Sequence, residues 1–243
     1  MAPDFWVSAG VGAMLASLHL WFPWFETRLA PRIPAWLPFT GGAAVGYVAL
    51  YMLPKLGDKT VEIMAKSEVG ATEFWLYRLY LFLLAGIVAE VIADRIERTN
   101  EHSWGALGFD IVVHAVYGFF AGLLVVESPR AGALPRMLIA TALGLHLMGM
   151  VHHLRLQHAA LYDGALRWLL FATVLGGVLV GELYTLPGGA IAAMTAFVSG
   201  VVLVTVMANE LPDPERHRIS PFLAGAGLFT LLIMALRSLP PAP

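Results

Sequence analysis

Residues 39–54 read FTGGAAVGYVALYMLP, and residues 197–212 read FVSGVVLVTVMANELP. Both stretches begin with Phe, place Gly three residues later and end on Leu-Pro, with no gap between them in the alignment. If each stretch forms a membrane helix, the helix boundaries between them make the two helices antiparallel. Such an inverted repeat is typical of secondary transporters, which bind their substrates between the repeats near the middle of the membrane. Small residues and terminal prolines also recur in unrelated membrane helices, and this remains the alternative explanation.

The composition predicts a membrane protein. Hydrophobic residues make up 58% of the 243 residues and charged residues only 13%, whereas a soluble domain carries about 25% charged residues. The net charge of −2 provides no basic field, so we expect no nucleic-acid partner. The absence of cysteine excludes disulfides, thiolate metal sites and iron–sulfur clusters. We expect an integral membrane protein surrounded by the lipid bilayer, with the bacterial inner (cytoplasmic) membrane as its location.

The apolar runs define the predicted fold. A helix needs about 20 apolar residues to cross the bilayer core, and eight runs approach that length, at approximately 5–25, 36–54, 74–93, 106–126, 136–155, 165–186, 190–211 and 220–238. The linkers between them carry most of the charges. The Pro-Gly-Gly connection at 187–189 is the tightest, and it predicts that the helices on either side are antiparallel neighbours. The predicted fold class is therefore an all-α polytopic membrane protein with one transmembrane domain, residues 1–243.

Two histidines lie deep in the predicted spans. His114 is near the middle of span 106–126, and Asp110 precedes it by four residues, which places both side chains on one helix face. An Asp in this position can orient the imidazole, as carboxylates do beside metal ligands. Ionisable groups at this depth are costly, so they are candidates for function. The alternative is a hydrogen-bonded histidine that only contributes to packing.

The next span carries a stripe of further metal-binding side chains. His146, Met150 and His153 follow helical spacing along one face of span 136–155, and His152 lies on an adjacent face. Imidazole and thioether ligands suit a soft or borderline ion such as zinc or copper. The acids lie nearer to the span ends, and we expect their side chains to reach the membrane interface. These acids are Glu90, Asp94, Glu127, Glu182 and Glu210.

Three segments together resemble the ZIP family of divalent metal transporters. Residues 196–215, AFVSGVVLVTVMANELPDPE, are similar to the helix-seven stretch of that family, which has Ala-Phe-x-x-Gly and ends in Glu-Leu-Pro-Glu. Residues 38–54 match the equivalent helix-two segment, and HAVYGFFAG at 114–122 resembles the helix-four motif. The resemblance implies eight helices in a 3+2+3 inverted-repeat bundle. Repeat one would then cover about residues 5–93, the central helices about 106–155 and repeat two about 165–238.

The chain departs from the family at the metal ligands. The family's helices four and five supply His, Asn, Asp and Glu to a paired metal site. An alignment on Gly118 places Val113, His114 and Tyr117 where the family has its His, Asn and acid. An alignment on Gly149 leaves the ligand positions of the next helix without any acid. Because divalent ions need compensating negative charge in a low dielectric, this departure argues against a standard two-metal site.

These observations favour a ZIP-like transporter of a divalent transition metal cation, with zinc first, acting through a reduced histidine-based site. His114 and His146 would be the metal ligands. Supporting or route residues would be Asp110, Tyr117, His152 and His153. The first alternative is a ZIP-like binding or structural subunit that does not transport and belongs to a homodimer or a larger membrane assembly.

A second alternative is a b-type cytochrome in which His114 and His146 hold haem from opposite sides. An absorption spectrum distinguishes that possibility. The chain has no intramembrane Gly-x-Ser-x-Gly motif, no His-Glu-x-x-His motif and no Asp dyad at matching depth. We therefore predict that the protein is not an enzyme and has no resident cofactor, the metal ion being its substrate.

Overall fold

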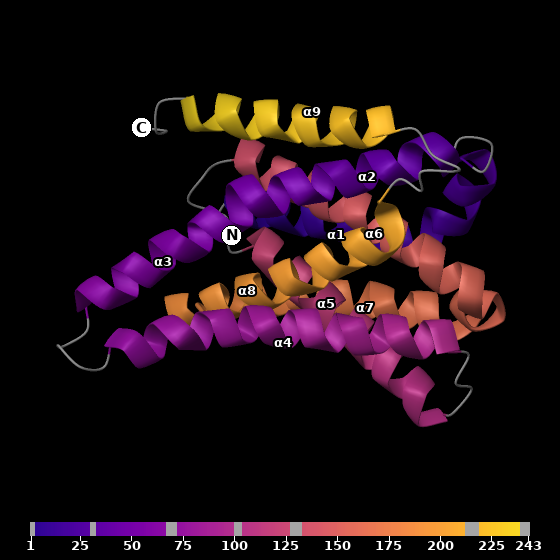
Figure 1. The fold of residues 1–243 in the computed structure, drawn as a ribbon, viewed down its shortest axis with the longest axis horizontal. Helices are drawn as coiled ribbons and strands as arrows, with labels where there is room; N and C mark the ends of the chain where they lie inside the picture. Colours follow the sequence, from indigo (N-terminus) through magenta and orange to yellow (C-terminus); the bar gives the residue numbers. More distant parts are fainter. Residues whose placement is uncertain are drawn as a thin grey trace.

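The computed structural model describes residues 3–29, 33–66, 72–99, 104–126, 133–211 and 219–238. Most of the long helices run approximately along the longest axis of the molecule (Figure 1). The α-helices are α1 (Pro3–Leu29), α2 (Ile33–Tyr47), α3 (Leu53–Lys66), α4 (Thr72–Thr99), α5 (Trp104–Val126), α6 (Ala133–Leu161), α7 (Arg167–Leu183), α8 (Gly188–Thr205) and α9 (Ile219–Ser238). Three π-helical turns connect some of them: η2 (Val48–Met52), η4 (Tyr162–Leu166) and η5 (Val206–Glu210).

The described helices are those of an all-α membrane protein. Among the described residues, five helical stretches are long and apolar enough to cross a bilayer: Phe5–Arg28, Ala35–Glu62, Leu107–Val126, Ala140–Leu183 and Gly188–Glu210. Many large apolar side chains point outward from the bundle, as a lipid-facing surface requires. Their composition and length therefore agree with an integral membrane protein.

Two predicted boundaries lie elsewhere in the structure. The helix that was expected to end at Pro54 continues from α2 through η2 and α3 to Lys66. A proline lacks the N–H that a helix interior uses, and the wider π-helical turn directly before Pro54 accommodates that loss. The connection expected between the spans 136–155 and 165–186 is also helical apart from His158, whose φ of −129° and ψ of 45° mark a kink near the end of α6.

The prediction that the helices flanking Pro187 are packed neighbours is wrong. Helix α7 packs against α5 and α1, whereas α8 packs mainly against α4. Close backbone approach explains this choice of partners. A Cβ atom added at Gly177 of α7 would overlap the Phe119 carbonyl of α5, and one added at Gly200 of α8 would overlap the Leu83 carbonyl of α4. The glycines therefore determine which helices pair, and the short connection does not.

Helices α2 and α9 form one of the closest crossings in the bundle, side by side in Figure 1. A Cβ atom added at Gly42 would overlap the carbonyl oxygen of Phe222. On the other helix, a Cβ atom added at Gly225 would overlap the carbonyl oxygen of Phe39. Each helix therefore contributes one glycine that lets the two backbones come into contact. Membrane helices associate through such close packing, because the hydrophobic effect does not drive helices together in lipid.

Helices α4 and α8 form a second crossing of the same kind, on the opposite side of the bundle in Figure 1. A Cβ atom added at Gly200 would meet the carbonyl oxygen of Leu83, and one added at Gly86 would meet the carbonyl oxygen of Phe197. Both crossings thus use one glycine from each helix and the carbonyl of the residue three positions before the partner's glycine. Helices α5 and α6 lie between these crossings, and their side chains contribute much of the buried core.

Candidate functional site

Ionisable side chains are buried inside the helix bundle, and two of them contradict the sequence-based expectation. Glu90 of α4 is 4% exposed and Glu210 of η5 is fully buried, so neither side chain reaches the membrane interface as predicted. His114, His146 and Asp110 are also buried. The interior therefore contains carboxylates, although the alignments on Gly118 and Gly149 placed no acid at the family's ligand positions.

His146 and Glu210 form the most deeply buried pair. The His146 Nδ1 and Glu210 Oε1 atoms are 3.2 Å apart, at ion-pair distance. The Thr40 hydroxyl of α2 donates a hydrogen bond of 3.3 Å to the other carboxylate oxygen, Oε2. The pair thus joins the central helix α6 to η5 and to α2.

Glu210 fits between two glycines. A Cβ atom added at Gly41 would lie 2.8 Å from the Glu210 Cβ, and one added at Gly149 would lie 2.5 Å from Oε1. The η5 turn ends directly after Glu210, because Leu211 precedes a proline and adopts an extended backbone with ψ of 141°. The wide π-helical turn and the two missing side chains together give the carboxylate its place in the interior.

The predicted pairing of Asp110 with His114 is present in α5. The His114 Nδ1 donates a hydrogen bond of 2.9 Å to the Asp110 carbonyl and lies 3.1 Å from the Asp110 Oδ1. Because the ring directs its hydrogen to the carbonyl, the carboxylate oxygens have no hydrogen bond. This arrangement fixes the ring orientation and leaves Nε2 as the atom of His114 that is available to a ligand.

Tyr117 and Glu90 occupy the region around the two histidines. The Tyr117 ring lies edge-on to the His146 ring, with centroids 5.7 Å apart. The Glu90 Oε1 accepts a hydrogen bond of 2.7 Å from the Thr205 hydroxyl, and Glu90 has electrostatic interactions with His114 and His146. Within the described ranges no hydrogen bond or ring contact joins His114 directly to His146.

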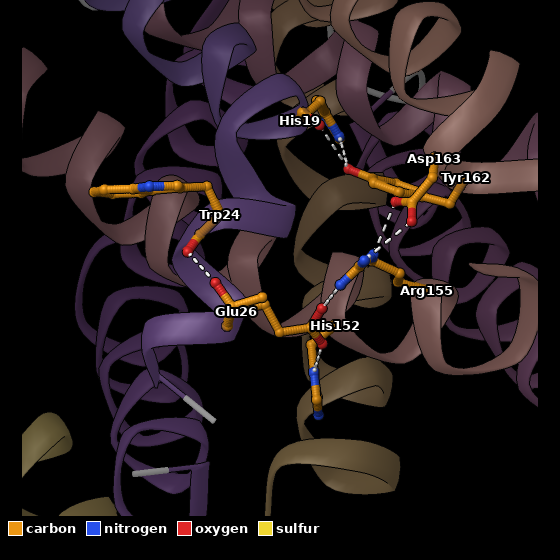
Figure 2. Close-up of polar contacts among 8 residues, drawn as sticks. His19, Trp24, Glu26, His152, Arg155, Tyr162 and Asp163 are labelled. Carbon is orange, nitrogen blue, oxygen red and sulfur yellow. Dashed lines mark hydrogen bonds and ion pairs between the residues drawn. The ribbon is translucent and has the colours of Figure 1, made fainter. Parts of the chain in front are cut away.

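The structure directs the other two predicted histidines to different partners. The His152 Nδ1 lies 2.7 Å from the Glu26 Oε1 of α1, and Figure 2 shows this contact beside Arg155. The His153 Nε2 donates a hydrogen bond of 3.1 Å to the Asn209 carbonyl in η5. Neither imidazole is paired with His114 or His146, so the six predicted site residues do not form one cluster.

Several buried polar atoms of this region have no hydrogen-bond partner. They are Glu90 Oε2, both carboxylate oxygens of Asp110, Tyr117 OH, both ring nitrogens of His146 and Glu210 Oε1. The Asp110 Oδ1, His146 Nδ1 and Glu210 Oε1 atoms lie at ion-pair distance from a partner, whereas Glu90 Oε2, Asp110 Oδ2, Tyr117 OH and His146 Nε2 have neither contact and could receive a polar ligand. Imidazole nitrogens and carboxylate oxygens suit a borderline divalent cation.

The described residues do not already enclose a metal ion. Across the described ranges, no three His, Cys, Asp or Glu side chains lie close enough together to hold one. The structure instead presents two separate imidazole–carboxylate pairs with Glu90 near both. A cation bound here would need a rearrangement that brings a third ligand to one of the pairs.

Known proteins add no assignment to this picture. No protein-family model matches the chain, and no curated protein matches it. What the structure gives on its own is an all-α membrane protein with buried acid–histidine pairs.

Proposed function

We propose that the chain is an inverted-repeat, eight-span carrier that moves a divalent transition metal cation, with zinc first, across a membrane. The 3+2+3 arrangement would pair α1 to α4 as repeat one with α7 to α9 as repeat two, around the central helices α5 and α6. The ZIP-like resemblance of the sequence gives the expected class of cargo.

The positions of the π-helical turns support the repeat. When Phe39 is aligned with Phe197, η2 (Val48–Met52) and η5 (Val206–Glu210) coincide residue for residue. π-Helical turns are rare and are frequently found at functional sites. Two of them at equivalent positions therefore favour a common origin and a common use.

The helix crossings support the same repeat independently. The alignment that pairs Phe39 with Phe197 also pairs Gly42 with Gly200. Gly42 contacts α9 and Gly200 contacts α4, in each case through a carbonyl of the partner helix. Under the proposed symmetry, these are the same contact made twice, with α9 equivalent to α4.

One observation carries the assignment of a cation site: His146 and Glu210 are buried at the junction of both repeats with the central helix. Glu210, the last residue of η5, would belong to repeat two, Thr40 and Gly41 would belong to repeat one, and His146 lies on α6. Secondary transporters place their binding sites at such a junction. The carboxylate would offset the charge of the cation, and the imidazole would favour a transition metal over Mg²⁺ or Ca²⁺.

Uptake into proteoliposomes tests the proposal. We expect the wild-type chain to move Zn²⁺ into vesicles that hold a zinc-sensitive dye, and Zn²⁺ to raise the melting temperature of the purified protein. His146→Ala and Glu210→Gln should each lower uptake about tenfold or more, by analogy with the loss of metal-site residues. The matched control is His158→Ala, which removes another histidine of α6 at the kink. Zinc uptake no faster than in empty vesicles would overturn the proposal.

The second candidate function is a binding or structural subunit that does not transport, and the separation of the two acid–histidine pairs favours it. In such a subunit, exposed aromatic residues would contact a partner. Trp24 and Phe25 of α1 are 48% and 36% exposed, whereas Phe22 is buried in the core and is excluded from that role. Purification with a stoichiometric partner chain and no zinc-dependent change in stability would support this function.

A further inference from the structure

The corner between α1, α6 and η4 contains a network of charged side chains that lies outside the proposed cation site. We define the Glu26 network as Glu26, His152, Arg155 and Asp163 (Figure 2). Arg155 bonds Glu26 through Nη1, and it binds both carboxylate oxygens of Asp163, at 2.8 Å and 3.0 Å. His152 contacts the other carboxylate oxygen of Glu26. Glu26 is thus the one residue of α1 that this network ties to α6.

A second contact joins the same two parts of the chain. The Tyr162 hydroxyl of η4 donates a hydrogen bond of 3.1 Å to the His19 carbonyl of α1 (Figure 2). The Glu26, His152 and Arg155 side chains are 13%, 6% and 22% exposed, whereas Asp163, at 40%, meets solvent at the edge of the network. Ion pairs and hydrogen bonds of this kind are either formed or broken, and water can hydrate each side chain once they are broken.

A chain of contacts links the Glu26 network to the cation site. The His152 ring lies against the His153 ring, with centroids 5.4 Å apart, and His153 bonds the Asn209 carbonyl next to Glu210. Along α6, His152 is roughly 9 Å from His146 at 1.5 Å per residue. The network therefore lies between the end of α6 and the His146–Glu210 pair.

We propose that the Glu26 network is a gate: it closes the path to the His146–Glu210 pair at this end of the bundle, and it opens when α1 parts from α6. Its meaning as a transport gate rests on the proposed function. A carrier that rocks its repeats against the central helices must break contacts between α1 and α6 in one of its states. Charged contacts suit that role, because they hold one arrangement without requiring interlocked apolar packing.

Cysteine accessibility tests the gate directly, and the chain contains no native cysteine to interfere. The probe is Met150→Cys, because Met150 is 2% exposed and lies on α6 between the network and His146. A membrane-impermeant charged methanethiosulfonate is applied to sealed proteoliposomes from either side. Glu26→Ala and Arg155→Ala each break the Glu26–Arg155 ion pair, the first by removing the carboxylate and the second by removing the guanidinium. Both should raise the labelling rate at position 150 about tenfold or more, from one side only, since charged hydrogen bonds are lost.

Two controls distinguish a gate from general loosening. Ala140→Cys probes the other half of α6, where the residue is also 2% exposed, and its labelling should stay unchanged in every background. Glu62→Ala breaks the exposed Lys59–Glu62 ion pair of α3 and should leave position 150 protected. Unchanged labelling at 150 in both variants overturns the gate, and so does equal labelling of positions 140 and 150.

The labelling does not depend on transport, so the two proposals fail separately. If position 150 opens as expected but no Zn²⁺ uptake occurs, the gate stands as a conformational element and the transport proposal fails. If Zn²⁺ uptake occurs while Glu26→Ala and Arg155→Ala leave position 150 protected, the transport proposal is supported and the gate proposal fails.

Discussion

Gly149→Ala is the sharpest test of how the cation site is built. The added Cβ would lie 2.5 Å from the Glu210 Oε1 and 2.8 Å from its Cδ, whereas ordinary contacts begin at 3.4 Å. The carboxylate must therefore move by about 0.9 Å, the difference between the first and last of these distances. The Glu210 Cβ and backbone carbonyl lie against Gly41 of α2, so the carboxylate end of the side chain must make this shift.

The size of the effect follows from this geometry. Forcing extra volume into a packed core costs about 1–3 kcal/mol. A shift of nearly 1 Å also separates the carboxylate from His146, and 1.4 kcal/mol corresponds to a factor of ten in affinity. We therefore expect Gly149→Ala to weaken zinc binding about tenfold or more and to lower the free energy of unfolding by about 1–3 kcal/mol.

The assay is calorimetric zinc binding to the detergent-purified protein, with unfolding followed by circular dichroism. Gly144→Ala on the same helix is the matched control, because its added Cβ would meet only the flexible ends of Leu18 and Leu15, at 3.3 Å and 3.5 Å. Both variants share the higher helix propensity of Ala, so that contribution cancels in the comparison. Equal zinc affinity in the two variants would refute the reasoning.

The remaining predictions concern the crossings and Glu90. Gly42→Ala and Gly200→Ala should destabilise the fold to a comparable extent, by about 1–3 kcal/mol or more, because each Cβ would overlap a partner backbone. Gly10→Ala should not destabilise the fold and should gain up to about 1 kcal/mol from the helix propensity of Ala, since nothing lies near its Cβ, and thermal unfolding distinguishes the three variants. Thr205→Val removes the hydroxyl that donates to Glu90 and should lower the free energy of unfolding by about 1–3 kcal/mol, measured by chemical denaturation.

The sequence alone predicted the helical class, because it follows from local composition. Apolar length predicts membrane helices. The Asp110–His114 pair was also predictable, since its two residues are one turn apart on the same helix. These features depend on one helix at a time.

The burial of Glu210 was not predictable from its position in the chain. A residue next to a helix end ordinarily reaches the interface, and the wrong expectation for Glu90 had the same origin. Glu210 is buried because of its neighbours in space. Gly41 and Gly149 come from two other helices and leave room for the carboxylate. Only the assembled bundle brings these positions together, although the placement of Glu210 within the repeated segment was a usable signal.

The role of Glu26 was missed for a related reason. The sequence places it in the charged stretch after the first apolar run, where a solvated linker was expected. In the structure α1 continues to Leu29, and Glu26 contacts His152 and Arg155 of α6. Charge that follows an apolar run therefore does not by itself mark the end of a membrane helix.

Under the proposed repeat, the chemistry of the two halves differs although η2 and η5 fall at equivalent positions. Under the alignment that superposes η2 on η5, Met52 occupies the position of Glu210, and Ser199 occupies the position of Gly41. The two equivalent pairs are both in contact: the Ser199 hydroxyl lies 3.6 Å from the Met52 Sδ, and Gly41 lies against Glu210. One junction therefore holds a carboxylate beside an imidazole, and the equivalent junction holds a thioether. Under the proposed function, a cation would be attracted to the first junction and would gain little from the second, so the proposed symmetric fold would have one preferred site, close to the Glu26 network.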